Sequence, residues 1–416
     1  MNRRDFNRFL LAIPTLKSSD LLSDPSDKKD VTIDLSAYSK ALLPMEHGRL
    51  VDLKGYYGSY RYPSRDQSMQ FMAFFSGVGG LYVQTMDENA NLTDWTIKNN
   101  VLTISFIGEP VEVVTQKIGK HWQEAAEIYR EWATSQWWCK SKGSNSFDFI
   151  TTASYSSDSY NKRNLDIARS RGLHKLGGWL TQWRRFDFDK MYPDYFPRSY
   201  SEFKGTVDWA RTNDITLFPF YNGVLVDYRF NIDLSPMAIV GLKPSKKTEH
   251  SYYACTSSEW KDYLIDKISG LDKLVGEPLG GAYIDLVAAT KPRVCFSEHH
   301  NHKKGSASAW VAGNRALFNK LDKYVIAEGN AEVYLDVVDG FLMHLHTGRH
   351  DIVPLWKAVY GDKSNSYGWD MRSVKSKKSF LEQQGLIQTF GVKAWGSPWM
   401  THRAEEKFLK LIPMQS

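Results

Sequence analysis

The chain has 416 residues, of which 42% are hydrophobic and 24% are charged, and these ordinary globular values exclude a disordered, collagen-like or coiled-coil protein. Its net charge of +6 comes from scattered pairs of basic residues rather than from one basic face, which argues against nucleic-acid binding. The 14 Trp, 22 Tyr and 21 Phe are an excess of aromatic residues and favour a protein that stacks flat ligands such as sugars.

The N-terminus resembles an export signal. Arg3 and Arg4 precede the apolar run 9–16, as in a twin-arginine signal, although the run is short and no clear cleavage site follows it. The run is also much shorter than the about 20 apolar residues of a membrane helix, so the sequence predicts no membrane span. We therefore predict an export signal and linker over residues 1–30 and a periplasmic or extracellular protein. The alternative is an exposed N-terminal helix on a cytoplasmic protein.

The next part of the chain has the pattern of a β domain. Short runs of strand-forming residues, separated by Gly and Asn turn signals, lie at 69–75, 80–85, 101–107 and 111–115. A helix is expected over 121–132, where apolar residues recur three and four positions apart. These features predict a small β-sandwich with a connecting helix over residues 31–140.

From residue 141 to the C-terminus, strand and helix patterns alternate, which is typical of parallel βα units. Helices are predicted at 200–212, 259–274, 307–321 and 375–390. The eight predicted strands are 147–152, 175–181, 215–221, 280–286, 324–328, 338–344, 353–360 and 391–396. Eight such strands over about 270 residues predict an α/β fold, a (β/α)8 TIM barrel.

Two carboxylates stand where the catalytic groups of such a barrel are expected. Functional residues lie at the C-terminal ends of the strands, and the fourth and fifth predicted strands end at Asp285 and Glu328. Asp285 holds the position expected of a nucleophile, and Glu328 is the better candidate for a second catalytic carboxyl. Glu332, just beyond, is predicted to cap a short helix, and it is the reserve candidate for the acid.

Six further side chains follow predicted strands on the same rim and are predicted to bind the substrate: Trp183, Asn222, Asp227, Arg293, His302 and Trp310. Aromatic faces can stack on the C–H surface of a sugar ring, and the polar groups can bind hydroxyls. The alternatives are loop packing for Trp183, a turn for Asn222 and core packing within its own helix for Trp310.

The cysteines and histidines raise the question of a metal. Cys139, Cys255 and Cys295 are too widely spaced for a disulfide framework or a cysteine-rich zinc site. Histidines at 299, 300 and 302, with a second pair at 344 and 346, could ligate a metal. The second pair resembles the metal pair of amidohydrolase barrels, which however follows the first strand rather than the sixth. We predict substrate contacts or a solvated loop for these histidines, no metal site and no cofactor.

The strand-end segments also carry a family resemblance. Residues 283–285, 292–295 and 327–332, together with 192–197 and 219–223, resemble an uncharacterised bacterial glycoside-hydrolase-like barrel family. That family is related to the endo-alpha-N-acetylgalactosaminidases and, more distantly, to the alpha-galactosidase and alpha-glucosidase superfamily. The resemblance covers roughly residues 79–399. It implies a retaining α-glycosidase with Asp285 as nucleophile and Glu328 as general acid/base.

Three functions compete at this point. A glycoside hydrolase acting on a carbohydrate explains the pair of strand-end carboxylates, which carbohydrate binding alone does not need. The second hypothesis is a non-catalytic carbohydrate-binding barrel that keeps an aromatic cleft. The third is a metal-dependent hydrolase that uses the two histidine clusters.

Overall fold

The computed structural model describes residues 30–140, 146–153, 158–187, 190–227, 229, 236–240, 251–343, 351–368, 376–395, 406–407 and 409–412. The predicted export signal, the pair His344 and His346, and the segments that directly follow the last three barrel strands lie outside these residues. None of the helices in the described ranges is both long and apolar enough to cross a bilayer.

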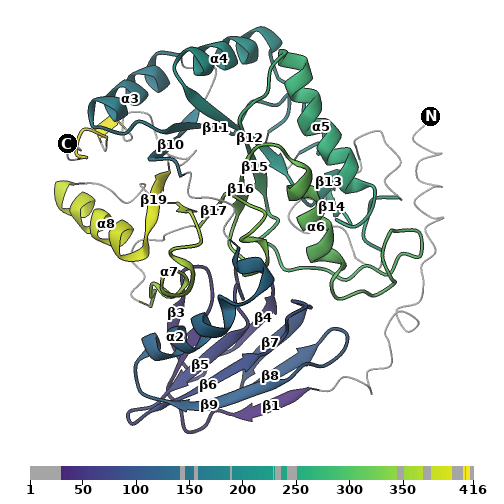
Figure 1. Cartoon of the computed structure of the whole chain (residues 1–416), viewed down its shortest axis with the longest axis vertical. Helices are drawn as coiled ribbons and strands as arrows, with labels where there is room; N and C mark the ends of the chain where they lie inside the picture. Colours follow the sequence, from purple (N-terminus) through teal and green to yellow (C-terminus); the bar gives the residue numbers. More distant parts are fainter. Residues whose placement is uncertain are drawn as a thin grey trace.

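Two antiparallel sheets form the N-terminal part of the protein (Figure 1). The first has the order β1 (Val31–Asp34), β8 (Val101–Phe106), β7 (Thr93–Lys98), β4 (Gly58–Tyr62). The second has the order β3 (Arg49–Asp52), β2 (Lys40–Leu43), β5 (Phe71–Phe75), β6 (Gly80–Thr85), β9 (Val113–Ile118). Buried side chains of both sheets, such as Met72, Trp95 and Ile104, belong to one hydrophobic cluster. The alternation along β8, with every second side chain buried, is the period expected of a strand that faces a core on one side.

Eight parallel strands close into a barrel, as the sequence predicted. In barrel order they are β10 (Phe149–Ala153), β11 (Leu176–Leu180), β12 (Ile215–Asn222), β15 (Gly281–Asp285), β16 (Tyr324–Glu328), β17 (Gly340–Leu342), β18 (Ser366–Tyr367) and β19 (Val392–Trp395). The accompanying helices are α3 (Asp158–Ser170), α4 (Tyr200–Thr212), α5 (Trp260–Val275), α6 (Ala309–Lys320), α7 (Leu355–Tyr360) and α8 (Lys377–Phe390). A short hairpin, β13 (Leu225–Asp227) and β14 (Ser251–Tyr253), follows β12.

One predicted strand is wrong. Residues 353–360 were expected to form the seventh strand, but they include the helix α7, and the seventh strand is the two-residue β18. Pro354 occupies the N-cap position, where its missing N–H costs nothing. Leu355, Trp356, Val359 and Tyr360 are buried, and this spacing places them on one helical face. The apolar run was too short for its period to separate a strand from a helix.

The helix α2 (Trp122–Ala133) connects the sheets to the barrel. Its buried positions Ala125, Ala126, Tyr129 and Ala133 recur every three to four residues, which explains why this segment is helical. Tyr129 stacks on Phe71 of β5, with 4.4 Å between the ring centroids. Figure 1 shows α2 between the sheets and α7 of the barrel, and the largest hydrophobic cluster includes residues of both parts. The two parts therefore share a packed interface.

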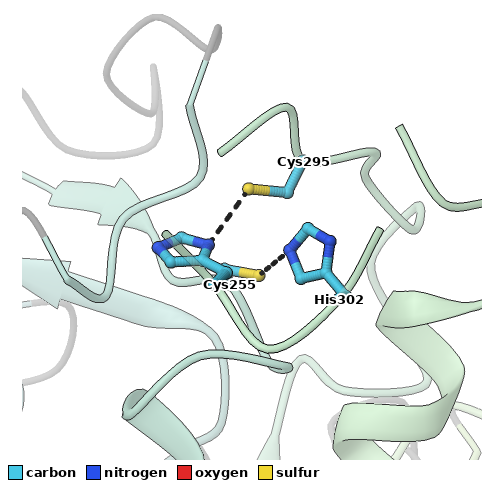
Figure 2. A group of neighbouring side chains, drawn as sticks. Cys255, Cys295 and His302 are labelled. Atoms are coloured by element: carbon cyan, nitrogen blue, oxygen red, sulfur yellow. Dashed lines mark hydrogen bonds between the residues drawn. The ribbon is translucent and has the colours of Figure 1, made fainter. Parts of the chain in front are cut away.

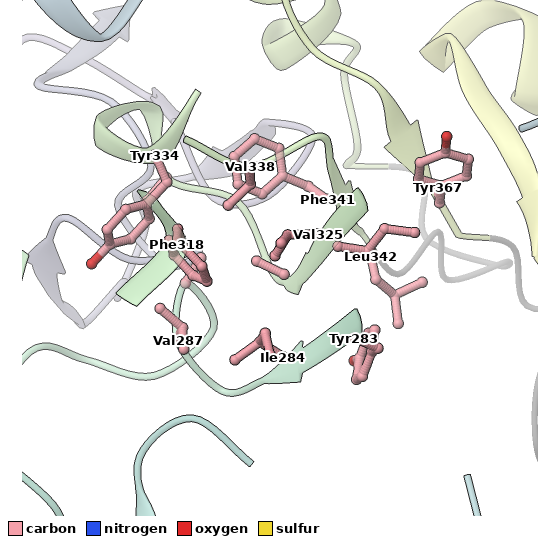
Figure 3. Packing of buried hydrophobic residues seen from close by; sticks show 14 of the residues in the cluster. Tyr283, Ile284, Val287, Phe318, Val325, Tyr334, Val338, Phe341, Leu342 and Tyr367 are labelled. Carbon is pink, nitrogen blue, oxygen red and sulfur yellow. The ribbon is translucent and has the colours of Figure 1, made fainter. Parts of the chain in front are cut away.

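The barrel interior is filled by large aromatic side chains rather than by a pore: the ring centroid of Trp179 in β11 lies 4.9 Å from that of Tyr283 in β15 and 5.1 Å from that of Trp395 in β19. Figure 3 shows part of the same hydrophobic cluster around β15, where Tyr283 and Ile284 lie near Val325 of β16 and near Phe341 and Leu342 of β17, and all of them are at most 3% exposed. Strands that are buried on both faces are expected to be continuously apolar, as these are. The polar residues that interrupt this pattern stand at the strand ends.

Candidate active site

Asp285 is the last residue of β15 and the first polar residue after four buried positions. It is 9% exposed. The amide Nδ2 of Asn222 donates a hydrogen bond of 3.2 Å to its Oδ2, and the phenol of Tyr283 donates to its Oδ1 at 3.5 Å. The two donors hold the carboxyl group at the end of the strand, in a fixed orientation.

Asn222 is placed for this contact by the barrel itself. It ends β12 and is the register partner of Asp285 across the β12–β15 pair. Its Oδ1 accepts hydrogen bonds from the backbone N–H groups of Val224 and Leu225, at 3.1 and 2.8 Å, which leaves Nδ2 free to face the carboxylate. Asn222 is fully buried and its amide holds Asp285, while the substrate contact expected of it from the sequence stays a prediction.

Glu328 ends the neighbouring strand β16. Its Oε2 accepts a hydrogen bond of 3.1 Å from the backbone N–H of Leu286, the residue that follows Asp285. Its Oε1 lies 3.7 Å from Nη1 of Arg65, and its side chain is 14% exposed. The register of β15 and β16 pairs Ile284 with Ala327, so one step further along it sets Asp285 beside Glu328. Two carboxyls on neighbouring strand ends is the arrangement that the sequence predicted.

The backbone around the two carboxylates has unusual conformations. Leu286 has a φ of +67°, a left-handed conformation that costs a residue with a Cβ roughly 1–2 kcal/mol. This conformation accompanies the N–H contact to Glu328, and such strained residues cluster at active sites. Gly329 has a φ of +73°, and a Cβ there would lie 2.7 Å from Cα of Ala289. Glycine therefore lets the loop after β15 pack directly on the loop after β16.

Tyr283 contributes a neutral hydrogen-bond donor to the site. Burial, together with the negative charges of Glu328 and Asp285, raises the pKa of Tyr283 well above its usual value. The phenol thus keeps its proton at neutral pH and stays a donor to Asp285. Tyr283 stands two residues before Asp285 on one strand, which puts both side chains on the same face, and this spacing is the signal for Tyr283 that the sequence contains.

Arg65 reaches the site from the N-terminal sheets. Its backbone N–H donates to the carbonyl of Ala288 at 2.8 Å, and its guanidinium lies between Glu328 and Glu46, at 3.7 and 4.0 Å. The positive charge favours the ionised form of nearby carboxyls. Sequence reasoning missed Arg65, because no local pattern links two residues that are 263 positions apart.

Three of the predicted substrate ligands have buried side chains in this structure. Trp183 is 1% exposed, and its ring packs on Tyr195 and Phe203. Trp310 is 3% exposed on the inner face of α6. Asp227 is fully buried, and although burial alone would raise its pKa, hydrogen bonds from Arg229 and from the N–H of Met191 lower it below its usual value. In this structure the three side chains pack within the rim loops and α6, and their role as sugar contacts stays a prediction.

Arg293 and His302 remain on the rim and are both half-buried. The guanidinium of Arg293 lies 3.6 Å from the ring centroid of Tyr253 in the β13–β14 hairpin. Nε2 of His302 faces the sulfur of Cys255 at 3.3 Å. Their role as substrate contacts stays a prediction. A pocket of about 260 Å³ lies nearby, but it is lined by residues such as Glu259 and His299 and not by the two carboxylates.

Comparison with known structures identifies the fold class. The barrel with its N-terminal sheets is the fold of α-glycosidases. An alpha-N-acetylgalactosaminidase of Bifidobacterium bifidum, NagBb, aligns with a TM-score of 0.68 and 14% identity, over 91% of this chain and 73% of its own. An alpha-galactosidase of Thermus thermophilus, TtGalA, aligns with a TM-score of 0.60 and 12% identity, over 93% of each chain. The expected likeness to alpha-galactosidases is thereby confirmed at the level of the fold.

The chain itself belongs to the family described as Domain of unknown function (DUF6259), whose model matches residues 107–371. A curated protein of Monosiga brevicollis, named "Putative glycoside hydrolase 22789", is 27% identical over 214 residues, which is 44% of this chain and 18% of that protein. The chain therefore spans about a fifth of the length of this relative.

Proposed function

We propose that the protein is a retaining glycoside hydrolase that cleaves an α-linked sugar from a glycan or polysaccharide, with Asp285 as nucleophile and Glu328 as general acid/base. The observation that carries the proposal is the pair of carboxylates on the adjacent ends of β15 and β16, connected through the N–H of Leu286. Glycoside cleavage through an oxocarbenium-like transition state requires two such groups.

The surroundings of the two carboxyls support a division of roles. Asp285 is short, nearly buried and held by the donors of Asn222 and Tyr283, which stabilise an ionised nucleophile. Glu328 has a longer side chain and is more exposed, so its carboxyl can reach the leaving oxygen and then a water molecule. In the first step Asp285 attacks the anomeric carbon while Glu328 gives its proton to the departing oxygen. In the second step Glu328 takes a proton from the water that displaces Asp285.

The substrate class follows from the relatives. The structural neighbours are named for α-linked galactose and N-acetylgalactosamine, so aryl α-galactosides and aryl α-N-acetylgalactosaminides are the first substrates to test. We further propose the division into residues 31–140, with the two sheets arranged as a β-sandwich, and a catalytic barrel over 141–416. Export is also proposed, and it is supported by the sequence alone, in which Arg3 and Arg4 precede the apolar run 9–16.

Azide rescue tests the two roles separately. With an activated aryl α-glycoside, Asp285→Gly should regain turnover when azide is added and release a β-glycosyl azide, because azide attacks from the face that the carboxylate occupied. Glu328→Ala should instead release an α-glycosyl azide, since azide then replaces the activated water in the second step. Asp322→Asn, an exposed residue two positions before the start of β16, is the matched control and should keep wild-type activity without azide. Identical azide products from both variants, or full activity of Asp285→Gly without azide, would refute the assignment.

A further inference from the structure

A second group of chemically active side chains lies apart from the two carboxylates. Cys255, Cys295, His300 and His302 each turn one sulfur or nitrogen atom inward, and these four atoms all lie within 4.8 Å of one another. The sulfur of Cys255 is 3.3 Å from Nε2 of His302, and the sulfur of Cys295 is 3.3 Å from Nδ1 of His300. Figure 2 shows Cys255, Cys295 and His302 facing one another from three backbone segments. The wide spacing of the cysteines predicted no metal role for them, but the fold brings Cys255 and Cys295 together with two histidines.

The spacing of these atoms matches a tetrahedral metal site. With Zn–S bonds of about 2.3 Å and Zn–N bonds of about 2.0–2.1 Å, a sulfur and a nitrogen ligand of one tetrahedral ion are about 3.5 Å apart. The two observed S···N distances are within about 0.2 Å of this value. We propose that Cys255, Cys295, His300 and His302 form a structural zinc site.

The ligand chemistry selects zinc among the common divalent ions. Two thiolates and two imidazoles form a soft, tetrahedral S₂N₂ set, which suits Zn²⁺ and lacks the oxygen ligands that Ca²⁺ and Mg²⁺ require. Four protein ligands also fill the coordination sphere, so no position is left for a water nucleophile. This arrangement favours a structural ion over the metal-dependent hydrolase that the histidines suggested in the sequence.

The ligands are held by the backbone around them. Nδ1 of His302 lies 2.9 Å from the carbonyl oxygen of Lys303, which can only accept, so this nitrogen carries the proton and Nε2 keeps its lone pair toward the cluster. The N–H of Cys255 donates to the carbonyl of Met237 at 2.6 Å, and the carbonyl of Cys295 accepts from Gly305 at 3.0 Å. Each ligand-bearing segment is thus fixed by contacts that do not use the ligand atoms.

The site has a route for the ion to enter. His300 lines the 260 Å³ pocket together with His299 and Asn301, while His302 is half-buried and the other three ligands are buried. An ion can therefore approach from the pocket side and become enclosed once bound.

The position of the site indicates what the ion would stabilise. Cys255 follows the β13–β14 hairpin, whereas the other three ligands belong to the loop after β15, so the ion would tie together two loops on the rim of the barrel. Arg293 and Tyr253, which stack on each other, stand two residues before Cys295 and Cys255. The zinc would therefore fix the position of Arg293, and only the value of this for substrate binding rests on the proposed glycosidase function.

Metal analysis of the full chain tests the site. Protein purified without chelator from zinc-supplemented medium should contain one zinc per chain, and Cys255→Ser and His302→Ala should lower this content more than tenfold. Two matched controls should keep it: His299→Ala, an exposed histidine of the same loop, and Cys139→Ser, the cysteine outside the cluster. A wild-type chain without zinc, equal zinc in all variants, or a Cys255–Cys295 disulfide in a non-reducing peptide map would overturn the proposal.

Cobalt substitution provides a readout that does not depend on the folding of any variant. Wild-type protein reloaded with Co²⁺ should show visible d–d bands of tetrahedral intensity and a near-ultraviolet thiolate-to-cobalt charge-transfer band. Six-coordinate spectra without the thiolate band would overturn the site. Zinc content and cobalt spectra do not depend on turnover. A failure of the glycosidase proposal would therefore not count against the zinc site, and a failure of the zinc site would not count against the glycosidase proposal.

Discussion

Glu328 and Glu332 are four residues apart on the same segment, yet their surroundings differ completely. Glu328 stands at the barrel rim, receives one backbone N–H and has Arg65 at 3.7 Å. Glu332 is fully buried at the start of a short 3₁₀ turn, where the phenols of Tyr129 and Tyr360 donate to its carboxylate at 2.6–2.8 Å. One carboxyl is accessible to a ligand, and the other is enclosed by protein.

The comparison shows why a perturbed pKa alone does not identify a catalytic acid. Burial raises the pKa of Glu332 to about 7, although hydrogen bonds from Tyr360, Tyr129 and Tyr62 lower it in part. A carboxyl with such a pKa suits general acid catalysis at neutral pH. No substrate can reach this side chain, however, so Glu332 is a structural group between α2, the sheets and the barrel. Glu332 is therefore no longer an alternative candidate for the general acid, the role that the sequence had left open for it.

The largest expected effect belongs to Glu328. Glu328→Gln removes the proton donor but keeps the shape of the side chain, so kcat/KM for a glycoside with a poor leaving group should fall about 10²- to 10⁴-fold. Activated aryl glycosides need little protonation and should be affected much less in the glycosylation step. Steady-state kinetics with a series of leaving groups measures this difference, with Glu131→Gln, an exposed glutamate of α2, as control. Equal losses for all leaving groups would contradict the role of Glu328.

Glu332 should instead govern stability and its dependence on pH. Its pKa in the folded protein is raised from 4.5 to about 7, so the folded state binds more protons than the unfolded state between these values. The contribution is therefore fully present below about pH 4.5 and is lost as the pH rises to about 7, a change of about 3 kcal/mol. In Glu332→Gln this loss should be absent. Denaturant unfolding at pH 5 and pH 7.5, compared between the wild type and the variant, measures it, and parallel pH dependences would argue against a raised pKa.

A smaller effect is expected at Asn222. Asn222→Ala removes the donor to Oδ2 of Asp285 and both hydrogen bonds to the loop after β12. In the proposed mechanism the buried Asn222 positions the nucleophile, so kcat should fall about 10- to 100-fold while KM changes little. A rise in KM with unchanged kcat would instead favour the substrate-binding role that the sequence suggested.

The smallest expected effect is at Arg65. Its guanidinium is 3.7 Å from Glu328 but its side chain is 37% exposed, so solvent screens much of the interaction. Arg65→Gln should move the alkaline limb of the kcat/KM profile to higher pH by a few tenths of a unit, since the loss of a positive charge favours the protonated acid. Arg211→Gln, on the exposed face of α4, should leave the profile unchanged.

The sequence predicted most of the barrel because its signals there are local. An apolar run that ends in a carboxylate places Asp285 and Glu328 at strand ends without knowledge of the fold. The β18 strand could not be found, because two residues carry no period, and the neighbouring α7 has a strand-like composition. Trp183 illustrates a second limit of prediction from sequence. The position of an aromatic residue after a strand does not show whether its ring is buried or exposed.

Contacts between distant segments were beyond the reach of the sequence. Arg65 of the N-terminal sheets meets Glu328 of the barrel, and Cys255 meets His302 across two loops, so neither pair has a characteristic spacing. The tyrosines around Glu332 come from β4, α2 and α7. Such sites depend on the packing of whole elements, which the local periodicity of a chain does not encode.

Residues 64–68, which connect β4 and β5 of the N-terminal sheets, contact the barrel just after the two strands that end in Asp285 and Glu328. The N–H of Arg65 donates to Ala288 after β15, and the carbonyl of Ser68 accepts from the N–H of Glu332 after β16. A barrel joined to a foreign N-terminal domain would lose both hydrogen bonds and the charge of Arg65. A chimera built from this barrel would therefore have to carry the loop of residues 64–68 with it, because the contacts between the N-terminal sheets and the barrel run beside the two carboxylates of the proposed active site.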